Sequence, residues 1–257
     1  MKKSFDRFLQ TQTASVVLPA VTIVLTLVLW QVGVGLFNVP RFILPAPTQI
    51  LAAMNQWSPV ILRHSLTTLT STLLAFALAL VGGILLGSII GSSRLAHLCL
   101  YPLLVGFNTI PKVALVPLLA IWFGLGTIPA VITAFLLAFF PIAVNVAVGL
   151  ETVEAEMRDV LRSLGASSWE IFTKVGLPHS MPYLFASLKV AISFAFVGSV
   201  ISETVASNQG LGYLIVSASS SFDVPLAFAG LAALGIMGIL LYTFFAALER
   251  YVLSWRQ

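Results

Sequence analysis

The sequence has few charged residues. Asp, Glu, Lys and Arg make up 9% of its 257 residues, whereas 59% are hydrophobic and the mean hydropathy is +1.04. A soluble domain carries roughly 25% charged residues, because these cover the surface that faces water. The shortage of charge therefore excludes a chain that faces water on all sides. It predicts an all-α protein that crosses a membrane several times and whose solvent is largely lipid.

Cysteine and nucleotide-binding motifs are also scarce. Cys99 is the single cysteine, so a disulfide within the chain is excluded, and its hydrophobic neighbours favour a packing role. The chain has no G-x-x-x-x-G-K-[ST] phosphate loop, so it cannot hydrolyse ATP by that motif. We expect no catalytic residue, metal site or cofactor. The net charge of +4 is compatible with nucleic-acid binding, but in so apolar a chain we favour basic cytoplasmic loops and expect no nucleic-acid partner.

Six hydrophobic segments are each near the ~20 residues that a helix needs to cross a bilayer. They cover residues 16–37, 65–91, 98–123, 128–150, 182–206 and 225–249. If both termini lie inside, nine Lys and Arg residues are cytoplasmic, and only Arg41 and Arg63 are outside. Because cytoplasmic loops carry the excess of positive charge, we predict a multi-pass protein with both termini in the cytoplasm.

Proline and glycine give two of these segments special backbones. The third contains Pro111 and Pro117, and because proline removes a backbone donor we expect this helix to be bent or partly unwound. The second carries four glycines, for which we favour close helix packing over a role in gating. These are Gly82, Gly83, Gly87 and Gly91. Between the first two segments, residues 48–54 predict a short interfacial helix on the outer face, capped by Thr48.

A polar loop at residues 151–181 separates the fourth and fifth segments and holds five of the nine acidic residues. Its first half predicts an amphipathic helix, because five apolar residues fall on one stripe. These are Val153, Met157, Val160, Leu161 and Leu164. Gly165 follows directly, as the left-handed residue that ends a helix would.

The second half of this loop predicts another short helix. Ser167 and Glu170 have the spacing of a capping box, and Leu177-Pro178 is expected to end the helix, with Pro182 in the first turn of the next span. The residues alone leave two interpretations open: an interfacial hairpin that connects two spans, or a docking surface for a soluble partner. A connection needs only a few residues, so thirty residues of specified structure suggest a function.

The loop resembles a known motif. The stretch 159–165, then nine residues, then Val175-Gly176-Leu177-Pro178, is similar to the cytoplasmic EAA motif of binding-protein-dependent ABC importer permeases. That motif reads Glu-Ala-Ala, three residues, Gly, nine residues, Ile-x-Leu-Pro. Gly165, Leu177 and Pro178 match it. Asp159 and Val175 are conservative departures, and Val160 and Leu161 replace both alanines.

Further landmarks extend the resemblance over residues 38–250. Four short stretches resemble the sulfonate/taurine/nitrate-type subgroup of these permeases. They are Phe42-Ile43-Leu44-Pro45-Ala46-Pro47, Ile110-Pro111 with Pro117, Trp122-Phe123-Gly124 and Gly210-Leu211-Gly212. The resemblance implies a type I importer permease of the MetI-like fold with six transmembrane helices. It implies an anchor helix with an outer interfacial segment at 1–64 and a permease core at 65–257.

The resemblance also implies partners and coupling residues. It implies separate ABC ATPase subunits, a second permease subunit in a homodimer, an extracytoplasmic solute-binding protein, and a place among the lipids of the bacterial cytoplasmic (inner) membrane. The ATPase would seat the loop at 151–181, with six residues at the contact: Asp159, Arg162, Gly165, Ala166, Leu177 and Pro178. The solute is expected to be small and polar or anionic, and relatives in this subgroup handle sulfonates, nitrate, bicarbonate and small heterocycles.

Some polar residues lie within the spans, where ionisable groups are costly and usually line pathways or pair with one another. Our hypothesis is that Lys112 and Glu203, with Asn108 and Asn145, form part of the solute pathway or its outer gate. A structural Lys112–Glu203 pair is an equal alternative. Lys189 is expected to reach the cytoplasmic headgroups.

Two other functions compete with an importer. An ion-coupled secondary transporter would carry acidic residues at mid-membrane and often internal repeats. The sequence shows no convincing repeat, and its acidic residues lie mainly in the loop at 151–181. A membrane scaffold would not need prolines in a central span.

Overall fold

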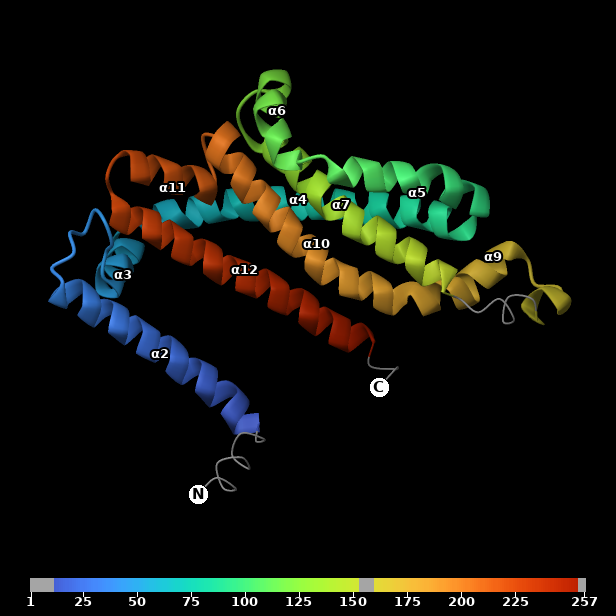
Figure 1. The fold of residues 1–257 in the computed structure, drawn as a ribbon, viewed down its shortest axis with the longest axis horizontal. Helices are drawn as coiled ribbons and strands as arrows, with labels where there is room; N and C mark the ends of the chain where they lie inside the picture. The colour runs from blue at the N-terminus through green and yellow to red at the C-terminus, as the bar shows by residue number, and fades with distance from the viewer. Residues whose placement is uncertain (1–11, 153–159, 254–257) are drawn as a thin grey trace.

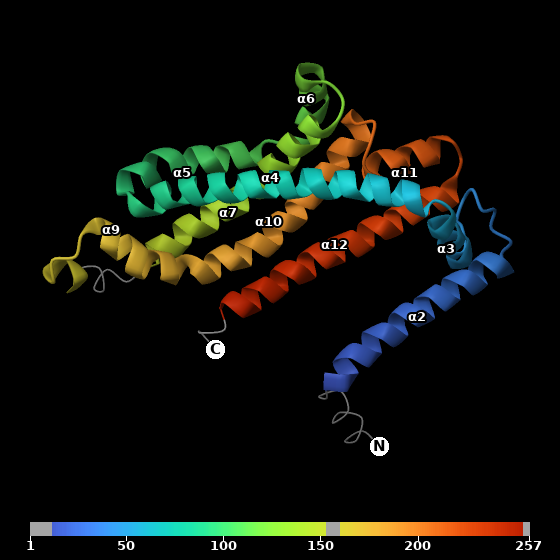
Figure 2. The same cartoon turned by 180° about the vertical axis from the view of Figure 1, so that it is seen from behind.

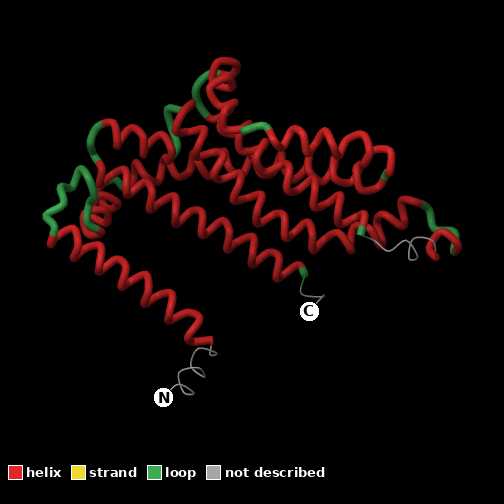
Figure 3. The backbone as a smooth tube through the Cα atoms, in the orientation of Figure 1, coloured by secondary structure: helices red, strands yellow, loops and turns green. Residues whose placement is uncertain are grey.

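The computed structural model describes residues 12–152 and 160–253, and within these ranges the regular structure is helical without strands (Figure 3). Five helices are long and apolar enough to cross a membrane, and a bent pair is a sixth candidate span by length and composition. The long helices are α2 (Gln12–Leu36), α4 (Ser58–Ser92), α5 (Arg94–Thr109), α7 (Thr127–Glu151), α10 (Leu177–Ala206) and α12 (Val224–Val252). The shorter ones are α3 (Pro47–Gln56), α6 (Val116–Phe123), α9 (Ser168–Ile171) and α11 (Leu211–Ser220). The prediction of six spans is confirmed.

The centre of the molecule is a three-helix core of α4, α7 and α10 (Figures 1 and 2). Small side chains bring these helices together, and alanines of all three form the buried cluster between them. The glycines of α4 face α7 so closely that a Cβ on Gly87 would lie 2.5 Å from the carbonyl oxygen of Ala143. On α10, a Cβ on Gly198 would lie 2.7 Å from the Cα of Ala134. Close helix packing, the favoured interpretation of the glycines in α4, is what the structure shows.

We expect Gly87→Val to destabilise the core. The added side chain would meet the Ala143 carbonyl oxygen and, at 2.8 Å from its Cβ, Val146, so α4 and α7 must separate. Overpacking of this kind costs about 1–3 kcal/mol. Thermal unfolding of the detergent-solubilised protein would measure the loss. Gly33→Val is the matched control, because a Cβ on Gly33 has none of the described residues within 4 Å. Equal melting temperatures for the two variants would contradict the prediction.

The third span is broken, as its prolines predict. Helix α5 ends at Thr109, a 3-10 turn covers Lys112–Leu115, and α6 then leaves at 74° to the preceding helix. Pro111 has no N–H to continue α5, and Ile110 before it takes an extended conformation with ψ 127°. Figure 1 shows α6 projecting from the core, and Ile121 and Trp122 on it are exposed.

The N-terminal helices lie to one side of the core. Both views show α2 apart from the other spans (Figures 1 and 2). It contacts α3, and its Trp30 ring lies 6.1 Å from the ring of Phe228 on α12. The predicted interfacial helix is present as α3, but Thr48 does not cap it. Its N-cap is Ala46, because Pro47 occupies the first helical position. The N–H of Ala46 donates to the side-chain oxygen of Gln49 at 3.1 Å.

Candidate functional site

The first helix of the loop at 151–181 ends at Gly165 as predicted. Gly165 has φ +84°, a left-handed conformation that disfavours residues with a Cβ. The N–H of Ala166 donates to the carbonyl of Leu161 at 3.0 Å, and the N–H of Gly165 donates to that of Arg162 at 2.9 Å. These two bonds form a Schellman motif, which satisfies the last carbonyls of the helix. Residues 153–159, and with them Asp159, lie outside the described residues.

The predicted capping box opens the second helix. The N–H of Ser167 donates to the carboxylate of Glu170 at 2.9 Å, and the N–H of Glu170 donates back to the Ser167 hydroxyl at 3.3 Å. Glu170 also lies 3.7 Å from the amino group of Lys174, one turn later. The turn at 165–167 is therefore fixed on both sides by hydrogen bonds within the loop itself.

The prediction that Leu177-Pro178 ends this helix is wrong. Leu177 is helical, with φ −60° and ψ −53°, and the chain continues from α9 through a π-helical stretch, Phe172–Gly176, into α10. The wider π turn offers a reason, because it moves the carbonyl oxygens that the ring of Pro178 would otherwise meet. Pro182 likewise lies inside α10 and not in the first turn of a separate helix.

Large apolar side chains of this loop point away from the rest of the chain. Val160 is 58% exposed, Leu164 77% and Trp169 71%. The ring of Trp169 is stacked on that of Phe172, with centroids 5.6 Å apart, which holds the indole at the surface. An ordered element that exposes side chains of this kind is suited to contact with another protein.

Both ends of the loop are attached to the helices beside it. Glu151, the last residue of α7, pairs with His97 of α5. The Thr152 hydroxyl lies 3.4 Å from Nε2 of His179, near the start of α10. A movement of the loop would therefore act on α5 as well as on α7 and α10.

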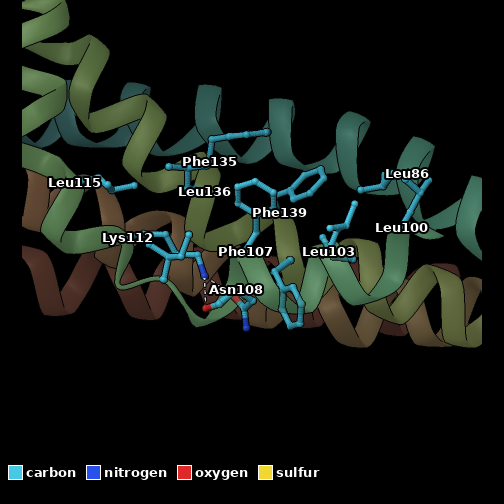
Figure 4. A pocket seen from close by; sticks show the side chains of 13 residues that line it. Leu86, Leu100, Leu103, Phe107, Asn108, Lys112, Leu115, Phe135, Leu136 and Phe139 are labelled. Carbon is cyan, nitrogen blue, oxygen red and sulfur yellow. Dashed lines mark hydrogen bonds between the residues drawn. The ribbon is translucent and has the colours of Figure 1, made fainter. Parts of the chain in front are cut away.

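Two of the predicted pathway residues contact each other at the break in the third span. Lys112 donates from Nζ to the carbonyl of Asn108 at 2.7 Å and to its side-chain oxygen at 2.6 Å (Figure 4). The Asn108 carbonyl lies in the last turn of α5. Because Pro111 ends the helix here, this carbonyl is available to the side chain of Lys112. Both residues line a cavity of about 510 Å³ between α4, α5 and α7.

Asn145 of α7 faces a neighbouring cavity of about 410 Å³ that Asn108 also lines. Its amide donates to the carbonyl of Pro141 at 2.8 Å, one turn earlier in the same helix. The structure therefore brings three of the four predicted pathway residues to adjoining cavities: Asn108, Lys112 and Asn145.

Glu203 lies in a different place, where α10 meets α4 and α11. It is 2% exposed, and its carboxylate accepts hydrogen bonds from the Thr68 hydroxyl at 2.8 Å and the N–H of Gly212 at 3.0 Å. The Thr68 oxygen in turn accepts from the N–H of Leu211 at 2.8 Å. The first N–H groups of α11, which have no partner inside a helix, are thus satisfied by side chains.

Gly210 completes this arrangement. Its N–H donates to Nδ1 of His64 at 3.0 Å, its φ is +99°, and a Cβ here would overlap the carboxyl group of Glu203. Gly210-Leu211-Gly212 is recognisable in the sequence as a landmark, but its contact with Glu203 was not predicted. Thr68 and His64 were not among the predicted site residues. Among the ion pairs of the described residues, none joins Lys112 to Glu203.

The expectation for Lys189 is corrected. Its amino group lies 2.6 Å from the carboxylate of Glu249 on α12, with both side chains about three-quarters buried. Lys189 therefore has an ion-pair partner in the neighbouring helix and does not extend toward the headgroups. The pairing offsets the cost of placing either charge inside the bundle.

The chain is similar to known membrane proteins. The family described as binding-protein-dependent transport system inner membrane component matches residues 79–255. The riboflavin transport system permease protein RibX of Chloroflexus aurantiacus is 37% identical over 91% of this chain and 88% of its own. The putative aliphatic sulfonates transport permease protein SsuC of Bacillus subtilis is 31% identical over 93% and 86%.

The fold also matches a solved structure. An inward-facing structure of the MetNI methionine ABC transporter contains a chain that aligns with a TM-score of 0.67 at 20% identity. The alignment covers 77% of this chain and 98% of that one. At this identity the likeness concerns the fold, and it agrees with the MetI-like architecture expected from the sequence.

Proposed function

Because the chain belongs to the family of binding-protein-dependent transport system inner membrane components, it is a permease subunit of an ABC importer, and we propose that its loop at 151–181 is the surface that seats the ATPase. The family assigns ATP hydrolysis to a separate subunit, so the chain is not itself an enzyme. Its relatives are permeases for small solutes, which sets aside the ion-coupled transporter and the scaffold.

The observation that carries the proposal is the set of exposed apolar side chains on an internally braced loop. Leu164 and Trp169 lie on either side of the Gly165 turn, and both are more than two-thirds exposed. The Schellman motif and the capping box fix the turn through hydrogen bonds among residues 161–170. A preformed apolar knob of this kind loses little conformational entropy when it is buried in a groove of a partner.

We assign the contact to the six residues of the EAA-like stretch. Gly165 and Ala166 form the turn, Arg162 supplies a charge beside it, and Leu177 and Pro178 continue the second helix into α10. Asp159, which occupies the glutamate position of the motif, completes the set by its place in the sequence. Closure of the ATPase would move this loop as one body, because its two helices are joined by hydrogen bonds at the turn.

The orientation follows from the same assignment. With the loop on the ATPase side, the termini also lie in the cytoplasm, and the α11 end of the molecule faces the solute-binding protein. This placement agrees with the excess of Lys and Arg on the loop side. We place the protein in the inner membrane on these grounds.

A second permease subunit is part of the proposal. Helix α6 projects from the core (Figure 1). Ile121 and Trp122 on it are exposed, as are Leu125 just after it and Phe107 on α5. Phe107 also lines the cavity of Asn108 and Lys112, and exposed apolar side chains of this kind suit a pathway that is closed by another copy of the chain. The solute would then cross between two copies of α5, α6 and α7, past Asn108, Lys112 and Asn145. Glu203 would hold the outer end of each copy in shape.

The proposal is tested by co-purification of the ATPase subunits with Leu164→Glu. A charge at this position would be buried without a partner on docking, and we expect retention of the ATPase to fall about tenfold or more. Phe222→Glu is the matched control, because Phe222 is 78% exposed at the other end of the bundle. ATP-dependent uptake into membrane vesicles should fall with retention. Full retention of the ATPase by Leu164→Glu would remove the loop from the contact.

The His97–Glu151 pair offers a separate test of how the loop acts on the pathway. Helix α5 carries both His97 and Asn108, so breaking the pair should separate loop movement from pathway movement. In the unmodified protein the rings of His97 and Tyr101 are stacked, with centroids 4.8 Å apart. His97→Phe keeps a ring in this stack but removes the partner of Glu151. We expect the amount of solute moved per ATP hydrolysed to fall about fivefold.

Transport and ATP hydrolysis are measured together in proteoliposomes for this purpose. Tyr101→Phe serves as the control, because it retains the ring stack and leaves the ion pair intact. A normal ratio of transport to hydrolysis in His97→Phe would show that the pair does not take part in coupling.

A further inference from the structure

The cavity at the break of the third span has one polar end and apolar walls. It measures about 510 Å³ and is lined by aliphatic and aromatic side chains, with Lys112 and Asn108 as its polar members. Figure 4 shows these two residues together and away from Leu86 and Leu100, which line the opposite part of the cavity. Ligand sites in proteins commonly have this size and this composition, with few polar groups in an apolar wall.

The polar end offers hydrogen-bond donors. A lysine ammonium has three N–H groups, and two of those of Lys112 are taken by the carbonyl and side-chain oxygens of Asn108. One N–H of Lys112 and the amide group of Asn108 remain as donors. None of the residues that line the cavity is acidic. The end therefore carries one positive charge and favours a ligand with an anionic or carbonyl acceptor.

The walls favour a flat ring. Four phenylalanines line the cavity: Phe107, Phe135, Phe139 and Phe140. The ring centroids of Phe135 and Phe139 are 5.3 Å apart, and their planes are inclined at 39°, so the two rings form one aromatic surface. Aromatic pairs of this geometry gain energy beyond that of burial alone. A small oxyanion would leave most of this cavity of about 510 Å³ unfilled.

We propose that this cavity holds the transported solute on its way through the pathway, and that the solute is a planar aromatic or heteroaromatic molecule with an anionic or carbonyl acceptor at one edge. The acceptor binds Lys112 and Asn108, and the ring lies among the phenylalanines. The inference rests on the proposed function, because it takes these two residues to be part of the pathway. A phospholipid tail is a poorer occupant, since a saturated chain does not require aromatic walls and leaves the donors unmatched.

Three probes separate the contributions of ring and charge. Naphthalene-2-sulfonate has both features, ethanesulfonate has the same anion without a ring, and (naphthalen-2-ylmethyl)trimethylammonium has the ring with the opposite charge. Equilibrium dialysis against the permease, purified with its ATPase subunits in nanodiscs, measures their binding over empty nanodiscs. We expect naphthalene-2-sulfonate to bind saturably and at least tenfold more tightly than the other two.

Substitutions in the cavity should weaken this binding selectively. Lys112→Met and Phe139→Ala are each expected to weaken binding of naphthalene-2-sulfonate tenfold or more. Leu103→Trp fills part of the cavity without removing a polar group, and it should weaken binding to the same extent. It provides the test if either of the other two variants fails to fold. The matched controls are Arg63→Met and Phe244→Ala, whose side chains are exposed and do not line the cavity. Both should bind the probe normally.

Three outcomes would overturn the inference. Equal binding of ethanesulfonate, or binding that Lys112→Met, Phe139→Ala and Leu103→Trp leave unchanged, would show that the cavity does not select an aromatic anion. A tightly held phospholipid that is lost from Leu103→Trp would assign the cavity to lipid. Retention of the ATPase is measured on the same preparations. If it persists while probe binding fails, the importer assignment stands and only the class of solute is wrong.

Discussion

Gly165→Pro is expected to abolish ATP-driven uptake and to reduce retention of the ATPase subunits about tenfold or more. Proline fixes φ near −65°, whereas Gly165 has φ +84°, and proline lacks the N–H that donates to the carbonyl of Arg162. The Schellman motif is then lost, and the two short helices no longer meet at a fixed angle. Because no other residue in the described ranges 12–152 and 160–253 lies within 4 Å of a Cβ at this position, the damage should remain in the loop.

Gly165→Asn separates the backbone conformation from the side chain. Asparagine tolerates the left-handed region better than other residues with a Cβ, so this variant should keep the turn and most of the uptake. Co-purification and vesicle uptake are measured for both variants beside a thermal unfolding curve. Loss of function in Gly165→Asn to the same extent as in Gly165→Pro would show that the partner needs the glycine surface itself and not the turn.

The second large effect is expected at Glu203. Glu203→Leu removes the acceptor of the Gly212 N–H and of the Thr68 hydroxyl, and it leaves that N–H buried without a partner. An orphaned buried donor costs about 1–3 kcal/mol, and the first turn of α11 loses its contact with α10. We expect a lower melting temperature of the purified permease and a several-fold loss of uptake.

Glu203→Gln is the matched variant, because its amide oxygen can accept the same two hydrogen bonds without a charge. We expect it to melt close to the unmodified protein. If Glu203→Gln folds normally but loses transport completely, the charge of Glu203 acts in the pathway itself, as the sequence analysis hypothesised. If Glu203→Leu is as stable as the unmodified protein, the hydrogen bonds to α11 do not hold the fold together.

Features that depend on neighbouring residues could be predicted from the sequence. The spans follow from hydrophobic segments long enough for a bilayer, and the break in the third span follows from Pro111. Gly165 and the pair Ser167 and Glu170 fix the ends of two helices through bonds that reach no more than five residues along the chain. Local chemistry of this kind leaves little choice of structure, so these predictions are confirmed.

Features that depend on distant residues could not be predicted in the same way. Thr68 and Glu203 are 135 positions apart, and nothing in their local sequence shows that they meet. Helix α11 follows Gly210 in an apolar stretch too short to span, so it was not distinguished from a loop. The π-helical stretch before Pro178 was missed because the usual preference of the residue before proline is overridden by continuous helix on both sides.

The separation of α2 from the rest of the molecule has a mechanical consequence. Its side chains from Val17 onward are mostly exposed, and it is attached near its C-terminal end through α3 and the contact of Trp30 with Phe228. A helix held at one end can tilt to match the thickness of the bilayer at a small cost. The three-helix core, in which glycines lock α4 against α7, has no such freedom. Changes in lipid chain length should therefore be absorbed first by the angle of α2.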